Sequence, residues 1–193
     1  MRPRQRAALA PDSGMRVWRA ADRVSEPWKN GAGTMAVILT SPGGTDWDRL
    51  DWRVSTAVIT RSAPFSHFPG LDRLFTPYQG GTVTLRLPGQ VQKVTPGDAP
   101  FAFSGEAECY CDHDGAETLV LNLQTRAPYR AAAGYDASVW EGAPVACYLF
   151  ALEAMGDLAA FDLVEVKPTD CVPTGRALFV AINKISEIPV PTA

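Results

Sequence analysis

The sequence is poor in the residues that metal sites and disulfide frameworks require. Its 193 residues include two histidines, His67 and His113, and four cysteines that lack the spacing of a disulfide framework. Most metal sites of oxygenases draw on several histidines, and this chain offers too few of them. We therefore expect free thiols, no metal and no cofactor.

Charged residues are scarce as well, and they are unevenly distributed. They make up 20% of the chain, with a net charge of −3. Residues 1–14 hold three arginines and one aspartate, so the rest of the chain is more acidic than the total suggests. Nucleic-acid binding usually needs a basic face, and no cluster of lysine or arginine follows residue 14. We exclude nucleic acid as a partner.

Long apolar runs are also missing. No segment has enough consecutive apolar residues to cross a membrane, which excludes a membrane partner. The basic N-terminus leads into Ala-Ala-Leu-Ala-Pro without the apolar core of a secretory signal. We expect a cytoplasmic protein in which residues 1–14 form a disordered tail, with Met15 as a candidate start.

Glycine and proline, in contrast, are abundant at 16 residues each, and 46% of the residues are hydrophobic. The turn residues favour short strands over long helices, and the apolar content supports a sizeable core. We therefore predict an all-β chain. The expected strands cover residues 17–19, 35–39, 52–59, 74–78, 82–87, 91–94, 119–122, 147–153, 161–166 and 178–183.

Two stretches of the chain repeat one pattern. Val94–Asp98 and Val166–Asp170 each contain a strand end, a proline and an aspartate, and each precedes an apolar strand. Repetition in register predicts a duplicated all-β unit with the strand-and-turn rhythm of a cupin jelly roll. The predicted domain covers residues 15–193. One half lies at about 50–125, and the other, at about 140–186, includes the N-terminal strands.

Phe65–Arg73 concentrates the chemistry of a binding pocket. Its sequence, FSHFPGLDR, sets two phenylalanines around a Ser-His pair, followed by a Pro-Gly bend and an Asp-Arg pair. Because proline fixes φ and glycine permits positive φ, the bend separates the aromatic residues from the charged ones. The stretch predicts either a pocket rim or two core phenylalanines beside a surface ion pair.

Two further stretches could bring polar groups to such a pocket. Trp28–Thr34 (WKNGAGT) is a glycine loop before a strand, which suits either anion binding through backbone N–H groups or a plain hairpin corner. In Trp52–Ile59, alternation sets Arg53, Ser55 and Ala57 opposite an apolar face. If both faces are covered, the arginine needs a partner or a ligand. Otherwise it lies on a solvated outer face.

One group of potential metal ligands remains. Cys109, Cys111 and His113 alternate along the chain and would share one face of a strand. Their types suit zinc, but side chains on one straight strand point in parallel, and a fourth ligand is missing. We favour buried structural thiols over a metal site.

Together these motifs resemble the HutD/Ves family. The similarity covers residues 15–193 and rests on the Trp28–Thr34 loop, the Trp52–Ser55 strand, the Phe65–Arg73 bend and the Leu121–Leu123 strand. It implies a compact bicupin of RmlC type, in agreement with the duplication. Three positions depart from the family pattern, namely Ala32, His67 and Leu121.

Family members resemble an accessory protein of histidine utilisation and a stress-associated protein. The resemblance implies no established catalytic set. Our leading hypothesis is a metal-free protein that binds a small carboxylate metabolite of the formate, N-formylglutamate or urocanate class. It would modulate histidine utilisation, with a homodimer as a candidate assembly. The candidate ligand-binding residues are Trp28, Lys29, Asn30, Gly31, Gly33, Thr34, Arg53, Ser55, Phe65, Ser66, His67, Phe68, Arg73 and Asn122.

Two other classes stay open. A metal-independent epimerase or isomerase would use His67 as general base and Tyr78 as acid, with an arginine holding a carboxylate of the substrate. Such a base would need an acidic neighbour to fix its tautomer. A structural or interaction protein without a ligand would instead pack the Trp28 and Phe65 motifs solidly.

Overall fold

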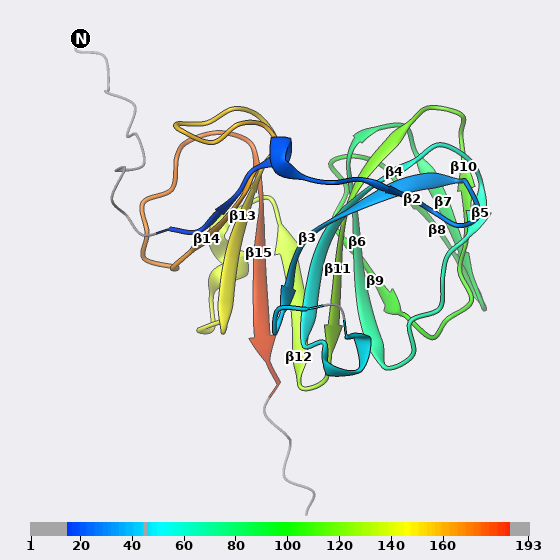
Figure 1. The fold of residues 1–193 in the computed structure, drawn as a ribbon, viewed down its shortest axis with the longest axis horizontal. Helices are drawn as coiled ribbons and strands as arrows, with labels where there is room; N and C mark the ends of the chain where they lie inside the picture. Colours follow the sequence, from blue (N-terminus) through cyan, green and yellow to red (C-terminus); the bar gives the residue numbers. More distant parts are fainter. Residues whose placement is uncertain (1–14, 45, 186–193) are drawn as a thin grey trace, which may run out of the picture.

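Strands dominate the computed structural model, which describes residues 15–44 and 46–185 (Figure 1). These residues form fifteen strands and three short 3-10 helices, so the predicted all-β class is confirmed. No helix among them is long and apolar enough to cross a membrane. The predicted tail at residues 1–14 and the predicted end of the domain at residues 186–193 lie outside the described residues.

The strands form three antiparallel sheets. The six-stranded sheet has the order β2 (Glu26–Pro27), β3 (Gly33–Ser41), β4 (Trp52–Ile59), β11 (Thr118–Arg126), β6 (Leu71–Gly80) and β9 (Phe101–Ser104). The four-stranded sheet has the order β5 (Ala63–Pro64), β10 (Tyr110–His113), β7 (Val83–Leu87) and β8 (Gln90–Val94). The five-stranded sheet has the order β1 (Val17–Trp18), β14 (Leu163–Val166), β13 (Ala146–Ala151), β15 (Ala177–Lys184) and β12 (Tyr129–Gly134). The 3-10 helices are η1 (Ala20–Asp22), η2 (Trp47–Arg49) and η3 (Ala137–Trp140).

The six-stranded sheet is the middle layer of the molecule (Figure 1). One of its faces packs against the four-stranded sheet through a cluster that includes Phe75 and Leu85. The other face packs against the five-stranded sheet through Leu123, Phe150 and Leu178. Side chains alternate along its strands, so both faces of this sheet receive side chains and both are covered.

The two repeated turns fold alike. In the first, the side chain of Asp98 accepts a hydrogen bond from the backbone N–H of Thr95 at 2.8 Å. In the second, Asp170 accepts one from Lys167 at 2.7 Å. An aspartate that binds nearby backbone in this way stabilises a turn locally. The turns agree with the repeat seen in the sequence, whereas the boundaries of the two halves stay a prediction.

The N-terminal segment bridges two sheets (Figure 1). Strand β1 pairs with β14 in the five-stranded sheet, and β2 pairs with β3 in the six-stranded sheet. Between them, Asp162 accepts hydrogen bonds from the backbone N–H of Ala20 at 2.7 Å and from Nη1 of Arg19 at 2.8 Å. Because Asp162 is fully buried, this contact fixes the place where the segment crosses.

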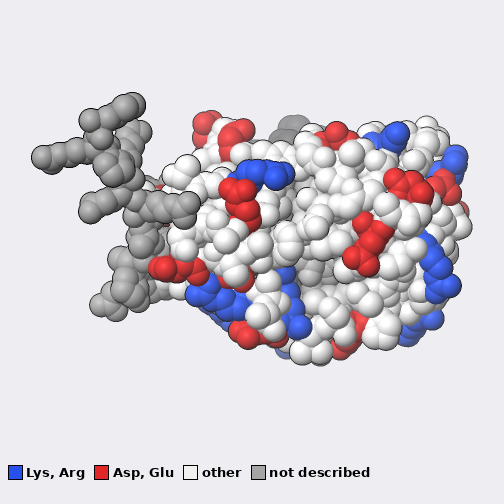
Figure 2. All heavy atoms as spheres, turned by 90° about the horizontal axis from the view of Figure 1, so that it is seen from above, with Lys and Arg blue, Asp and Glu red and all other residues white. Residues whose placement is uncertain are grey.

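The surface of the molecule carries mixed charge on the face shown in Figure 2. Acidic and basic side chains are interspersed there, and no broad area of one sign covers that face.

Candidate functional site

Strand β4 presents different side chains to its two neighbouring layers. Val54 belongs to the cluster against the five-stranded sheet, and Ala57 belongs to the cluster against the four-stranded sheet. Arg53 and Ser55 point the same way as Ala57, so the predicted alternation is confirmed. Arg53 is 4% exposed, and a solvated outer face is therefore wrong for this residue.

Two buried arginines lie in one row across three neighbouring strands. Gln124 of β11 pairs with Arg53 of β4 on one side and with Arg73 of β6 on the other. Directly paired residues of antiparallel strands share a face, so all three side chains point toward the four-stranded sheet. Two residues before Gln124, on the same face of β11, Asn122 pairs with Ser55 of β4. We call these five residues the polar patch.

Neither arginine of the polar patch has an acidic partner. The ion pairs of residues 15–44 and 46–185 lie elsewhere, so no carboxylate in these ranges lies within 4.0 Å of either guanidinium. The Nε atoms of Arg53 and Arg73 are both buried without a hydrogen bond. Nη2 of Arg53 contacts Sδ of Met35 at 2.8 Å, and a thioether is a weak acceptor. Buried charges without partners destabilise a protein, so the patch favours the binding of an anion.

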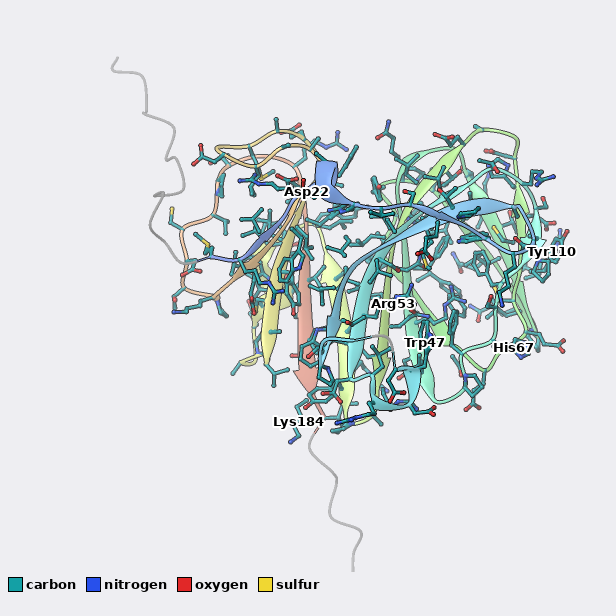
Figure 3. The ribbon with its side chains drawn as sticks, in the orientation of Figure 1. Asp22, Trp47, Arg53, His67, Tyr110 and Lys184 are labelled. Carbon is teal, nitrogen blue, oxygen red and sulfur yellow. The ribbon has the colours of Figure 1, made fainter. Side chains whose placement is uncertain are left out.

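Aromatic side chains cover the two guanidinium groups. Trp47 lies over Arg53, with the guanidinium carbon 4.6 Å from the ring centroid. Three phenylalanines surround Arg73 at similar centroid distances, namely Phe65 at 5.0 Å, Phe68 at 5.3 Å and Phe103 at 4.8 Å. In Figure 3, Trp47 lies next to Arg53, whereas His67 lies farther toward the edge of the molecule. Cation–π contacts offset part of the desolvation cost, but they do not neutralise the charges.

Burial also changes the acidity of both arginines. Desolvation lowers the pKa of Arg73 to about 10, and Cys109 beside it opposes that change. Desolvation likewise lowers the pKa of Arg53, and Glu26 opposes it. An anion bound at the patch would favour the charged form of both side chains. The lowered pKa values and the missing hydrogen-bond partners of the two arginines therefore both favour an anion at the polar patch.

Sequence comparison assigns the chain to a family. The family model named HutD matches residues 20–147, which is more than half of the chain and includes both arginines of the polar patch. The chain belongs to the HutD family. This finding confirms the resemblance carried by the sequence motifs.

Curated relatives of this HutD chain come from several bacteria. An uncharacterised 21.2 kDa protein in the hutC 3' region of Pseudomonas putida is 39% identical over 112 residues, which are 58% of this chain and 58% of that protein. Protein Ves of Cronobacter sakazakii is 35% identical over 100 residues, which are 51% of this chain and 54% of that protein. The chain thus spans little more than half the length of the curated relatives that it matches.

Two solved structures share the fold over nearly the whole chain. HutD from Pseudomonas fluorescens SBW25 matches with a TM-score of 0.75 at 27% identity, covering 89% of this chain and 100% of that one. A conserved protein of unknown function from Pseudomonas aeruginosa PAO1 also gives 0.75, at 28% identity, covering 90% of this chain and 100% of that one. The HutD fold therefore extends beyond the stretch that the family model matches.

The glycine loop of this HutD chain forms a hairpin corner. Backbone hydrogen bonds of 2.9 Å close it on itself, between Trp28, Gly31 and Gly33. The side chain of Asn30 bonds to the backbone, where Oδ1 accepts from the N–H of Ala32 at 3.1 Å and Nδ2 donates to the carbonyl of Pro64 at 3.4 Å. Lys29 and Asn30 are exposed. The structure does not bring these loop side chains to the polar patch.

Two residues at the end of the loop serve strand pairing. A Cβ atom at Gly33 would lie 2.2 Å from the carbonyl oxygen of Val58, so glycine is needed for β3 to approach β4 here. Thr34 pairs with Val58 and therefore faces away from Arg53. Both residues support the sheet rather than the site.

Trp28 and Phe65 contact each other and also pack against the core. Their ring centroids lie 6.1 Å apart in an edge-to-face arrangement, against the cluster between the six- and four-stranded sheets. Phe65 also contacts Arg73, so it has both a packing role and a place at the site. For Trp28, the structure shows packing.

The candidate catalytic residues are not brought together. His67 and Ser66 are exposed, and His67 lines a surface groove of about 480 Å³ that also contains Tyr110. Tyr78 lies on the other side of the six-stranded sheet, where its ring contacts Phe150 at a centroid distance of 5.0 Å. Desolvation raises the pKa of Tyr78 to about 12. The geometry does not support an acid–base pair of His67 and Tyr78.

The cysteine cluster consists of buried thiols. Cys109 and Cys111 both belong to the core cluster, and desolvation raises the pKa of Cys111 to about 12. Nδ1 of His113 accepts a hydrogen bond from the backbone N–H of Gly115 at 3.2 Å. In the part of the chain that the structure describes, no three His, Cys, Asp or Glu side chains are grouped to hold a metal ion.

The predicted site residues did not include Gln124, Trp47 or Phe103. Gln124 lies two residues after Asn122, so extending the predicted strand by one period would have placed it on the same face. Trp47 and Phe103 gave no such signal. They reach the arginines because the fold brings η2 and β9 beside them.

Proposed function

We propose that this HutD chain binds a small carboxylate at the polar patch, between Arg53 and Arg73. One observation supports the proposal most directly: two buried guanidinium groups share one face of a sheet and have no acidic partner among the described residues. A guanidinium matches a planar carboxylate through two parallel hydrogen bonds. Gln124, Asn122 and Ser55 would add neutral hydrogen-bonding groups around the ligand.

Strand spacing indicates the size of the ligand. Arg53 and Arg73 stand two strands apart, which corresponds to about 10 Å between their Cα atoms. Two long side chains can converge from that distance on one carboxylate, or each can hold one end of a short dicarboxylate. The aromatic cover and the opposing sheet leave no place for a polymer, so a small metabolite is the fitting class.

Entry of a ligand requires part of the aromatic cover to move. Trp47 is 41% exposed and belongs to the three-residue helix η2. Its ring contacts Phe68 at a centroid distance of 5.2 Å and lies over Arg53. A carboxylate on Arg53 would change the surroundings of this indole, so its fluorescence should report binding.

Two relatives support the choice of ligand and the wider role. HutD from Pseudomonas fluorescens SBW25 was solved in a formate condition, and the Pseudomonas putida relative lies in the hutC 3' region. We extend the proposal to a cytoplasmic protein that modulates histidine utilisation by binding a carboxylate metabolite. The polar patch holds no histidine, tyrosine or carboxylate, so the proposal is a binding protein rather than an enzyme.

Calorimetric titration tests the proposal, with formate, N-formylglutamate, urocanate and glutamate as probes. We expect saturable binding of at least one probe. Arg53→Ala or Arg73→Ala should weaken that binding about tenfold or more, because each leaves a buried charge unpaired in the complex. A change in fluorescence that is present in the wild type and lost in Trp47→Phe would localise the probe.

Arg86→Ala is the matched control. Arg86 is exposed and forms an ion pair with Asp112 outside the polar patch, so this variant should bind every probe like the wild type. Equal affinity of the wild type, Arg53→Ala and Arg73→Ala for a bound probe would contradict the proposal. So would the failure of all four probes to bind.

A further inference from the structure

A second pocket lies beneath the segment that crosses from β1 to β2. Its volume is about 460 Å³, and that segment and β3 form its walls. Asp22 lines this pocket, and in Figure 3 it lies where the segment crosses from the five-stranded sheet to the six-stranded sheet. The proposed carboxylate site uses none of the charged residues of this pocket.

Arg23 is a cation of this pocket without an ion-pair partner. Its Nη2 donates to the carbonyl of Phe161, and its Nε is buried without a hydrogen bond. No carboxylate of the described residues lies within 4.0 Å of it, whereas the neighbouring Arg19 is held by Asp162 at 2.8 Å. Desolvation lowers the pKa of Arg23, and Tyr78 and Asp162 oppose that change. A carboxylate bound to Arg23 would, like these two residues, raise the pKa of Arg23 and favour its charged form.

Two carboxylates line the same pocket without a cationic partner. Asp22 and Glu26 are exposed, and neither forms an ion pair with any residue in the ranges 15–44 and 46–185. Asp22 and Glu26 therefore line the pocket together with Arg23, and neither carboxylate lies within 4.0 Å of its guanidinium. A ligand that pairs with all three side chains would carry both an anionic and a cationic group.

Much of the remaining lining is apolar. It comes from both walls of the pocket, namely Val17, Trp18, Val24, Met35, Val37 and Ile38. Val24 is 78% exposed and Val37 is 46% exposed. Exposed apolar side chains at the edge of a pocket gain stability when a ligand covers them. The lining therefore favours a ligand with an apolar body beside its two charges.

We propose that this pocket binds a free amino acid with an apolar side chain. Its carboxylate pairs with Arg23, its ammonium group pairs with Asp22 and Glu26, and its side chain lies against Trp18 and Val37. A plain carboxylate such as formate is a poor ligand for this pocket, because the two acidic side chains repel it. The inference goes beyond the proposed carboxylate site and does not depend on it.

Isothermal titration with L-leucine and L-phenylalanine tests the inference. We expect saturable binding of one molecule to each chain. N-acetyl-L-leucine lacks the ammonium group and L-leucine amide lacks the carboxylate, so each should bind about tenfold more weakly or worse than L-leucine. The comparison of these three compounds separates an amino-acid site from a site for one charge alone.

Arg23→Gln should weaken binding of L-leucine about tenfold or more, because the ligand carboxylate loses its partner. Arg86→Gln is the matched control. Arg86 is exposed, pairs with Asp112 and does not line the pocket, so this variant should bind L-leucine like the wild type. Formate binding by Arg23→Gln should also match the wild type, which keeps the test independent of the polar patch.

Glu26→Gln distinguishes the two sites by the sign of its effect. The charge of Glu26 opposes the lowering of the Arg53 pKa, so Glu26 also affects the electrostatics of the polar patch. The variant should bind L-leucine more weakly and formate more tightly. Because Glu26 is exposed, the substitution leaves folding intact, and it decides the question if Arg23→Gln fails to fold.

Three results would overturn the inference. The first is the absence of saturable binding of either amino acid to the wild type. The second is equal affinity for L-leucine in Arg23→Gln and Arg86→Gln. The third is binding of N-acetyl-L-leucine as tight as that of L-leucine, which would make the pocket a plain carboxylate site.

Discussion

The two faces of the six-stranded sheet differ in what they bury. The face toward the four-stranded sheet carries the polar patch, with Arg53 and Arg73 unpaired by any described carboxylate. The face toward the five-stranded sheet carries Val54 and Leu123, packed against Phe150. Because neighbouring residues of a strand point to opposite faces, one sheet can carry an apolar packing surface on one face and the proposed binding site on the other.

Leu121 illustrates how the two faces of the six-stranded sheet differ. It is one of the three positions that depart from the family pattern. Leu121 is fully buried in the cluster against the five-stranded sheet, on the face opposite Asn122. The leucine therefore adds to packing and takes nothing from the polar patch.

The largest expected effect tests the packed face. Phe150→Ala should lower the free energy of unfolding by about 3–5 kcal/mol, because the ring is fully buried and its removal leaves a cavity. Phe103→Ala, on the side of the polar patch, should cost only about 1 kcal/mol, since Phe103 is half-buried. Chemical denaturation measures both values, and equal losses would erase the contrast between the faces.

A second prediction concerns the bridge between the sheets. Asp162→Asn should lower the free energy of unfolding by about 2 kcal/mol, because Asp162 accepts hydrogen bonds from Arg19 and from the backbone N–H groups of Ala20 and Ala159. Desolvation alone would raise the pKa of Asp162, but these donors outweigh it and hold the pKa below its usual range.

The pH dependence of this effect follows from the sign of the shift. The pKa of Asp162 is lower in the folded than in the unfolded protein, where it is about 3.9. Its contribution is therefore complete well above that value and is lost as the pH falls through the folded pKa. The stability difference between wild type and Asp162→Asn should shrink below about pH 4. The exposed Asp72 provides the control, because Asp72→Asn should change the free energy of unfolding by less than about 0.5 kcal/mol.

A third prediction sharpens the comparison from the other face. Arg73→Leu should raise the free energy of unfolding by about 1–4 kcal/mol, because a leucine replaces a buried charge that has no described acidic partner. The same variant should lose formate binding. Arg86→Leu removes an exposed ion pair and should change stability by less than about 1 kcal/mol. Strong destabilisation by Arg73→Leu would mean that the arginine serves the fold.

The smallest expected effect concerns the histidine of the bend. His67→Ala should change the free energy of unfolding by less than about 0.5 kcal/mol, because the side chain is exposed. Formate binding should be unchanged, because His67 does not belong to the polar patch. Thermal melting and calorimetry measure the two quantities, and a large loss of binding would bring His67 back as a site residue.

Much of the fold could be predicted because its signals are local. Turn residues and alternation located the ten predicted strands, all of which are present within a few residues. Strands β2, β5, β9, β10 and β12 were not among the predicted strands. Strand β12, with the sequence YRAAAG, does not alternate clearly and is held by pairing with β15. The bend at Phe65–Arg73 drew attention to Arg73, which the structure buries on the same face as Arg53, whereas its Ser66 and His67 are exposed and lie outside the polar patch.

The sequence by itself determined that Arg53 and Ser55 share a face, because that relation depends only on the period of one strand. It also carried the motifs of the HutD family. The tertiary structure alone decided that Arg53 and Arg73 flank Gln124, that Trp47 and Phe103 cover them, and that Tyr78 faces the other layer. These relations join strands far apart in the chain, so they depend on sheet register and layer packing, which no local pattern encodes.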